Sequence, residues 1–181
     1  MSAEIWWLLA VVILLIVASA FFSSAETALT AASDARMRQL AIKGNRRALL
    51  VEKLRADREG LIGTILIGNN AVNVIASALA TSVAISLFQE AGLLWATLTM
   101  TVVLVIFAEV MPKTYAFTYS DKYALAIAPA IRVVVVVLNP LAVGLRFLAS
   151  QMIRKHDEQE ANREEELRGL IELHGAEGDA D

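Results

Sequence analysis

The sequence predicts an all-α membrane protein, and three features support that fold class. Hydrophobic residues make up 57% of the 181 residues, above the share of about 45–50% typical of soluble domains. Three apolar runs, at residues 5–30, 61–88 and 93–111, each reach the roughly 20 residues that cross a bilayer as a helix. The charge is divided, because residues 1–150 carry a net charge of +3 and residues 151–181 a net charge of −6.

The first apolar run has an alternative interpretation as a cleaved signal peptide, because the small residues 18–20 resemble a cleavage site. A signal peptide begins with a basic segment, whereas the only charged side chain before Trp6 is that of Glu4. We therefore expect this run to stay in the protein as the first of three transmembrane helices.

Residues 34–59 form a basic segment between the first two runs, and we expect juxtamembrane helices there, with Ser33 or Asp34 as the first cap. Its eight Lys and Arg residues predict a cytoplasmic position and contact with anionic lipid headgroups. In a multi-pass protein of the cell membrane, the N-terminus is then outside and the C-terminus cytoplasmic. No aromatic residue interleaves these cations, so nucleic acid is not expected as a partner.

A fourth apolar block, residues 123–150, is interrupted by Pro129, Arg132 and the pair Asn139-Pro140. Proline removes a helical hydrogen bond and arginine is costly at the bilayer centre, so the block is either a kinked span or two short helices. We prefer a broken, non-spanning helical hairpin. The transmembrane domain then covers residues 1–150, and residues 151–181 form an acidic helical linker.

Polar residues inside the first two runs are informative, because a polar group in a membrane needs a partner or a function. Ser19 and Ser23 are one turn apart, and Glu26 follows on the same face. Asn69 and Asn73 form a similar stripe in the second run, where Gly68 and Asn70 adjoin it. Serine also bonds its own helix backbone and asparagine also joins helices, so structural roles compete with ligand roles.

The third run contains Glu109, three residues before Pro112. Because proline has no N–H, it deletes the hydrogen bond to the Ala108 carbonyl and predicts a helix break. A broken helix presents oxygens to a cation. The other two spans contain no Lys or Arg, so we expect Glu109 to pair with a bound cation, a proton, or Ser and Asn donors.

The available donors predict a hard cation. The sequence has no cysteine, and both histidines, His156 and His174, lie in the acidic segment, which leaves carboxylate, amide, hydroxyl and carbonyl oxygens. Oxygen ligands disfavour zinc, copper and iron. One carboxylate with neutral oxygens suits Mg²⁺ or Na⁺, whereas Ca²⁺ generally wants more carboxylate. Residue types alone leave Mg²⁺ and Na⁺ both open.

Three segments resemble, in order, the signature motifs of the CorC/cyclin-M (CNNM) family of magnesium transporters. They are Phe22–Leu29, Ile67–Asn73 and Ile106–Lys113. In addition, Glu164–Ile171 is similar to the family's linker into a cytoplasmic pair of CBS domains. We expect those CBS domains to be missing from this chain.

The resemblance implies a homodimer that binds Mg²⁺ among its spans. It assigns the ligands to side-chain oxygens and one backbone carbonyl, from Ser23, Gly68, Asn70, Asn73 and Glu109, with Ser19 and Asn69 as further candidates. Glu26 is a candidate ligand for a second ion, and Pro112 marks the expected helix break.

The expected function is therefore magnesium transport around a mid-membrane oxygen site, with export as the family's usual mode and Na⁺ coupling in some of its members. The alternative is a non-transporting module that senses Mg²⁺ or anchors missing cytoplasmic domains. An enzyme is not expected, because the spans contain no paired nucleophile and base.

Overall fold

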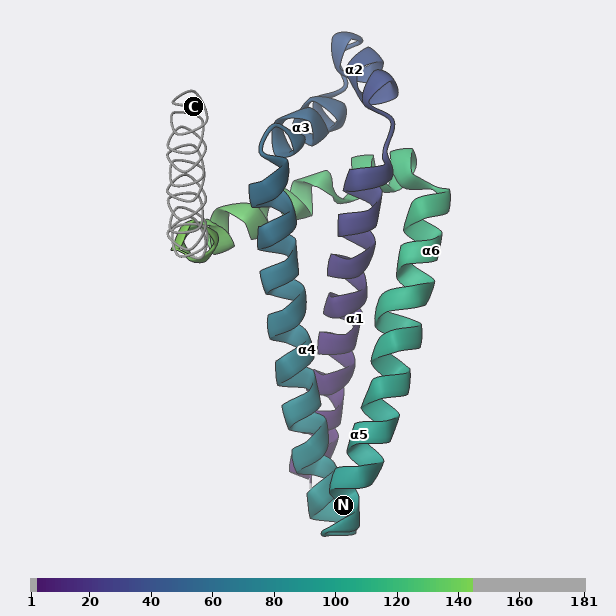
Figure 1. The fold of residues 1–181 in the computed structure, drawn as a ribbon, viewed down its shortest axis with the longest axis vertical. Coiled ribbons are helices and arrows are strands. Elements are labelled where there is room, and N and C mark those ends of the chain that lie inside the picture. The colour runs from purple at the N-terminus through teal and green to yellow at the C-terminus, as the bar shows by residue number, and fades with distance from the viewer. Residues whose placement is uncertain (1–2, 145–181) are drawn as a thin grey trace, which may run out of the picture. The chain divides into compact units, whose positions relative to one another are not determined.

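A computed structural model describes residues 3–144 of the chain (Figure 1). The elements are all helical and follow in the order α1 (Ala3–Ala31), α2 (Asp34–Ile42), α3 (Arg46–Arg55), α4 (Arg58–Phe88), α5 (Ala91–Val103), the π-helical segment η1 (Leu104–Val110), α6 (Met111–Thr118) and a last helix, Ser120–Gly144. The all-α class is confirmed for this part of the chain. The predicted acidic linker at 151–181 lies outside the described residues.

Three long helical segments run side by side in Figure 1: α1, α4 and the continuous helix from α5 through η1 to α6. They correspond to the three predicted spans, and each extends a few residues beyond the predicted range. α4 has 31 residues, so at 1.5 Å per residue it is about 46 Å long and exceeds a hydrocarbon core of about 30 Å. We call the end of this bundle that carries α2 and α3 the basic end.

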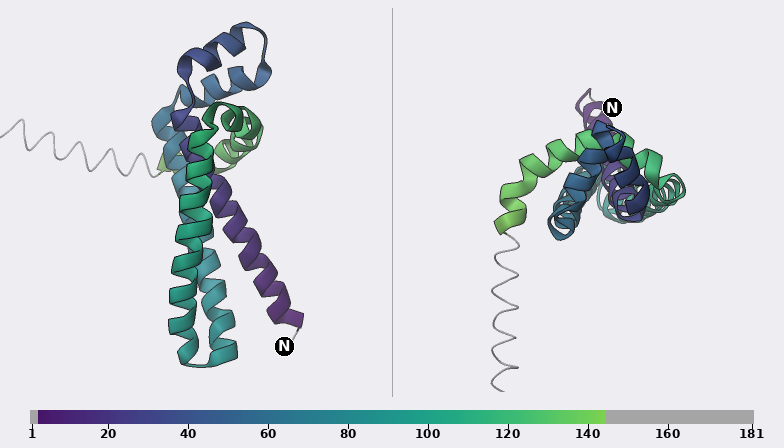
Figure 2. Two further views of the ribbon diagram at one scale, coloured as in Figure 1. Left: turned by 90° about the vertical axis from the view of Figure 1, so that its right-hand side faces the viewer. Right: turned by 90° about the horizontal axis from the view of Figure 1, so that it is seen from above.

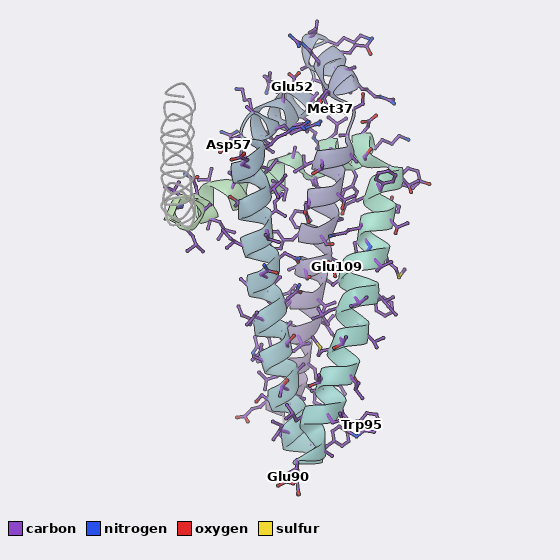
Figure 3. All side chains as sticks on the ribbon, viewed as in Figure 1. Met37, Glu52, Asp57, Glu90, Trp95 and Glu109 are labelled. Atoms are coloured by element: carbon purple, nitrogen blue, oxygen red, sulfur yellow. The ribbon has the colours of Figure 1, made fainter. Side chains whose placement is uncertain are left out.

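Aromatic side chains mark two levels along the bundle. Trp95 is exposed at the end opposite the basic end (Figure 3), which we call the Trp end. Trp6 and Trp7 are exposed near the start of α1, at the same end. Tyr115 in α6 and Tyr119 just after it are exposed nearer the basic end. Trp and Tyr concentrate at the two membrane interfaces. Trp95 and Tyr115 are separated by about 20 residues of helix, or about 30 Å, which matches the hydrocarbon thickness. With its exposed apolar side chains, the chain is a multi-pass membrane protein.

The fourth apolar block corrects one prediction. The structure has a single continuous helix, Ser120–Gly144, where the sequence predicted a broken hairpin at 123–150. Pro129 and Pro140 each remove one hydrogen bond, but a helix in apolar surroundings keeps its remaining ladder and bends instead of ending. Residues 145–150 of the predicted block lie outside the described residues.

By length and composition, Ser120–Gly144 is a fourth candidate span besides the three long helices. Its 120–139 part nevertheless crosses the basic end of the bundle instead of running along it (Figures 1 and 2). One face of this part enters the core at that end, through Ala124, Ile127, Ala128 and Ile131. The non-spanning role of the block stays a prediction.

The third span corrects a second prediction, because its helix does not break at Pro112. Residues Leu104–Val110 are π-helical, and the N–H of Met111 donates to the carbonyl of Ile106, five residues back. Pro112 lies in the first turn of α6, where a helix tolerates a residue without an N–H. The π-helical segment changes the hydrogen-bond register before the proline, so the helix continues.

Polar contacts hold the basic end together. Ser33 caps α2 as predicted, and its backbone N–H donates to Oδ1 of Asp121 at 2.9 Å. The side chain of Arg55 is 7% exposed and pairs with Asp34 at 2.9 Å. The same guanidinium donates to the carbonyl of Ala32 at 2.8 Å. This carbonyl lies just beyond the end of α1, where backbone oxygens have no partner within the helix.

Apolar packing is also strongest at the basic end. A large buried cluster there joins α1, α2, α3, α4 and the last helix, and it includes Met37, Val51, Ile65 and Ile131. Farther along, a small cluster contains only Val12, Ala76 and Met100. The left panel of Figure 2 shows α1 diverging from α4 and α5 toward the N-terminus. The bundle is therefore closed at the basic end and opens toward the Trp end.

Candidate ion-binding site

Two of the predicted polar residues meet between α1 and α4, which run antiparallel (Figure 1). The hydroxyl of Ser19 is buried and donates to Oδ1 of Asn69 at 2.9 Å. This bond joins residues that are 50 positions apart in the sequence. The structure thus brings the serine stripe of the first run against the asparagine stripe of the second.

Two further oxygens on these stripes are buried and unpaired. Ser23 lies one turn from Ser19 toward the basic end, and Asn73 lies one turn from Asn69 toward the Trp end. Neither Oγ of Ser23 nor Oδ1 of Asn73 has a hydrogen-bond partner within the described residues. A buried polar atom without a partner is costly, and it calls for an explanation such as an ion or water. Both atoms are therefore available as cation ligands.

Gly68 on α4 is buried and faces the ring of Phe22 on α1. A Cβ at this position would be 2.8 Å from the ring of Phe22, so only glycine lets the two helices pack this tightly without displacing that ring. The neighbouring Asn70 is exposed. Within this chain the structure brings Asn69, and not Asn70, against α1.

Glu109 has a partner that the sequence prediction missed. Its carboxylate pairs with the ammonium of Lys113 at 3.6 Å, one turn along the same helix. Lys113 also approaches the carboxylate of Glu26 on α1 at 3.8 Å. The expectation that Glu109 would pair only with a cation, a proton or neutral donors is therefore corrected. The partner is Lys113 on the helix that carries Glu109, whereas the other two spans contain no Lys or Arg.

Figure 3 shows Glu109 well away from both ends of the bundle, between Glu90 at one end and Met37 near the other. α1 and the α5–η1–α6 helix run in the same direction (Figure 1), and Lys113 is level with Glu26. Glu109, one turn nearer the Trp end, is therefore about level with Ser23. The polar groups form a track along α1 that runs from Asn73 to Lys113.

The donors along this track suit a hard cation with few charged ligands. No three Asp, Glu or His side chains come together anywhere in residues 3–144. A cation at the level of Glu109 would rely on this carboxylate with neutral oxygens such as Oγ of Ser23. Oδ1 of Asn73 lies about two turns, or about 12 Å, nearer the Trp end and belongs to a second level of the track. The donor set at the level of Glu109 fits Mg²⁺, which usually keeps several waters, or Na⁺, and it fits Ca²⁺ poorly.

Sequence reasoning missed three features of this region. The π-helical segment has no simple residue signature, although Pro112 and Glu109 did point to an irregular helix. The bond at 2.9 Å between the hydroxyls of Ser24 and Tyr123 depends on the part of the last helix that crosses the basic end, residues 120–139, which we call the transverse helix. No local pattern in the sequence predicts where this helix lies. The bridge through Lys113 could have been found from the spacing of Glu109 and Lys113, which puts them on one helix face.

Buried hydroxyl and amide oxygens, beside the 55% exposed carboxylate of Glu109 and among lipid-facing helices, define a membrane domain of transporter-like build. The chain belongs to the CNNM family, because residues 10–181 match the model of the cyclin M transmembrane N-terminal domain. This is a family of membrane domains and not a known class of enzymes.

Relatives in several organisms support this assignment. The UPF0053 inner membrane protein YfjD of Escherichia coli is 39% identical over 132 residues, which are 73% of this chain and 31% of that protein. A UPF0053 protein of Haemophilus influenzae is 40% identical over 100 residues, 55% of this chain and 24% of that protein. A chloroplastic DUF21 domain-containing protein of Arabidopsis thaliana is 32% identical over 132 residues, 73% of this chain and 20% of that protein. The chain thus spans less than a third of the length of these three relatives.

Proposed function

We propose that this domain carries Mg²⁺ across the membrane through a site between α1, α4 and η1. The observation that carries the proposal is that two buried oxygens without a partner, Oγ of Ser23 and Oδ1 of Asn73, lie at two levels of one track. The carboxylate of Glu109 lies on the same track, about level with Ser23. Oxygen donors with one carboxylate suit Mg²⁺. The resemblance of three motifs to the CNNM magnesium transporters favours Mg²⁺ over Na⁺ as the cargo.

Lys113 gives this proposal a mechanism. Its ammonium lies within 4 Å of both Glu26 and Glu109, so in this conformation a tethered cation neutralises both carboxylates. Mg²⁺ that binds Glu109 competes with this ammonium for the carboxylate. When Mg²⁺ is bound, the ammonium of Lys113 pairs with Glu26 alone. The adjoining π-helical segment supports the assignment, because such segments occur frequently at functional sites.

Transport by alternating access needs one end of the bundle to open while the other is closed. The described conformation is packed at the basic end and divergent toward the Trp end, as one state of such a cycle would be. The cations of residues 34–59 favour a cytoplasmic basic end. The family resemblance favours a homodimer, export with Na⁺ coupling through Glu26, and a link to cytoplasmic CBS domains.

Flux into proteoliposomes, followed with a Mg²⁺-sensitive dye, tests the proposal. Glu109→Gln should lower the flux more than tenfold, because the variant loses the charge that attracts the ion. Glu90→Gln is the matched control, since Glu90 lies at the turn between α4 and α5 and should leave flux unchanged. Normal flux in Glu109→Gln would contradict the site.

The competition with Lys113 gives a second readout that does not need flux. Lys113→Gln should raise the Mg²⁺ affinity severalfold in a calorimetric titration, while Lys122→Gln, which removes a cation from the following helix, should not. Protein that binds Mg²⁺ in this titration but moves none across the membrane would support the alternative, a Mg²⁺-sensing or anchoring module.

A further inference from the structure

A cationic groove lies between α3 and the transverse helix, away from the track of polar groups that runs from Asn73 to Lys113. It has a volume of about 640 Å³, and apolar residues separate the four cations that line it. These cations are Arg46, Arg47, Lys53 and Arg132. None of these four side chains forms an ion pair with a carboxylate in the described part of the chain. The groove thus concentrates uncompensated positive charge.

An apolar hollow of about 370 Å³ adjoins this groove and shares Leu50, Pro129 and Arg132 with it. It continues along the transverse helix over Val133, Val136 and Val137. These valines are 63–67% exposed. A cationic groove and an apolar hollow that meet at one arginine fit a ligand with an anionic head and a hydrocarbon tail.

The level of the groove in the bilayer points to the same kind of ligand. Both α3 and residues 120–139 lie at the basic end (Figure 1). Tyr123 of the transverse helix packs against Tyr115, which marks the membrane interface, with the ring centroids 5.9 Å apart. Lipid phosphates occupy this level, just beyond the hydrocarbon core. Arg132, which interrupts the apolar block in the sequence, can therefore keep its charge among headgroups while its stem covers the apolar hollow.

We propose that this site binds one anionic phospholipid. The phosphate contacts Arg132 and the cations of α3, and one acyl chain lies over Val133, Val136 and Val137. Guanidinium groups match phosphate oxygens in a two-pronged geometry. A zwitterionic lipid leaves much of this charge uncompensated, and a soluble phosphate leaves the valines uncovered. The site is independent of the proposed transport function.

Native mass spectrometry of the full chain tests the site. Protein released from mixed micelles should retain one phosphatidylglycerol in preference to phosphatidylcholine. Arg132→Gln should weaken this retention about fivefold, the expected effect of one cation at a lipid surface. Val136→Asn should weaken it as well, because it removes apolar cover and leaves every cation in place. Arg38→Gln, a cation of the same end that does not line the groove, is the matched control.

Three results would overturn the proposal. Equal losses in Arg132→Gln and Arg38→Gln would show diffuse attraction to lipid instead of a site. Displacement of the lipid by inorganic phosphate or glycerol phosphate as readily as by a short-chain phosphatidylglycerol would show that the hollow binds no tail. Lipid retention that appears only after removal of residues 151–181 would show that the acidic segment of this chain is the occupant. Melting curves of each variant check that it folds.

Discussion

The two ends of the helix bundle are built on different principles. At the basic end, a large apolar cluster is reinforced by the buried Arg55 and by Asp121, which ties the start of the last helix to the cap of α2. Toward the Trp end, α1 diverges from its neighbours, and the buried apolar cluster shrinks to Val12, Ala76 and Met100. Stability is therefore concentrated at one end.

This difference shows why the polar track lies where it does. The bond between Ser19 and Asn69 lies along α1 between Val12 of the small cluster and Ala25 of the large one, where tight packing gives way to divergence. Elements that move are drawn from the less stable parts of a structure. A site at this boundary can stay anchored at one end while its other side opens.

The first prediction compares one buried methionine from each end. Met37→Ala should cost about 2–5 kcal/mol of stability, because Met37 is 1% exposed in the large cluster and its loss leaves a cavity. Met100→Ala should cost clearly less, since Met100 lies in the small cluster on a divergent part of the bundle, where neighbours or lipid can fill the space. Unfolding of each variant in detergent micelles measures the difference, and equal costs would contradict the comparison.

The second prediction concerns the polar reinforcement of the basic end. Arg55→Lys should cost about 1–3 kcal/mol, because one ammonium cannot reproduce the two separate contacts of the guanidinium, to the carbonyl of Ala32 and to Asp34. Arg47→Lys is the control and should be nearly neutral, because Arg47 is exposed. A fully stable Arg55→Lys variant would mean that apolar packing alone holds this end.

Most of the fold followed from local signals in the sequence. Apolar length placed the three long helices, and Ser33 placed the start of α2. The errors concern how proline acts in context. Pro129 and Pro140 predict breaks from the sequence alone, yet the helix through them continues, because neighbouring packing and an apolar environment decide whether a missing hydrogen bond ends a helix.

The sequence predicted which residues line the candidate site, but it predicted less well which of them contact each other. Helical periodicity put Ser19, Ser23, Asn69 and Asn73 on facing stripes. Which of two adjacent asparagines faces α1 depends on the rotation of α4, which the close contact at Gly68 sets, and no residue pattern encodes that contact directly. The partner of Glu109 was missed although it lies only one turn away on the same helix.

The smallest predicted effect concerns the middle of the bundle. In a double-mutant cycle of Ser19→Ala with Asn69→Ala, the coupling should be about 0.6 kcal/mol, the average for hydrogen bonds between membrane helices. Ser86→Ala in place of Ser19→Ala is the control and should show no coupling to Asn69, because the Ser86 hydroxyl bonds its own helix at Val83.

A measurable coupling would mean that α1 and α4 stay packed as far as Ser19. The two helices would then separate only beyond Ser19, toward Asn73. Absence of coupling in detergent, with its return when Mg²⁺ is added, would mean that the ion and not the hydrogen bond joins α1 to α4 at this level. The boundary between the packed and the divergent parts would then move with the ion, as transport through the track requires.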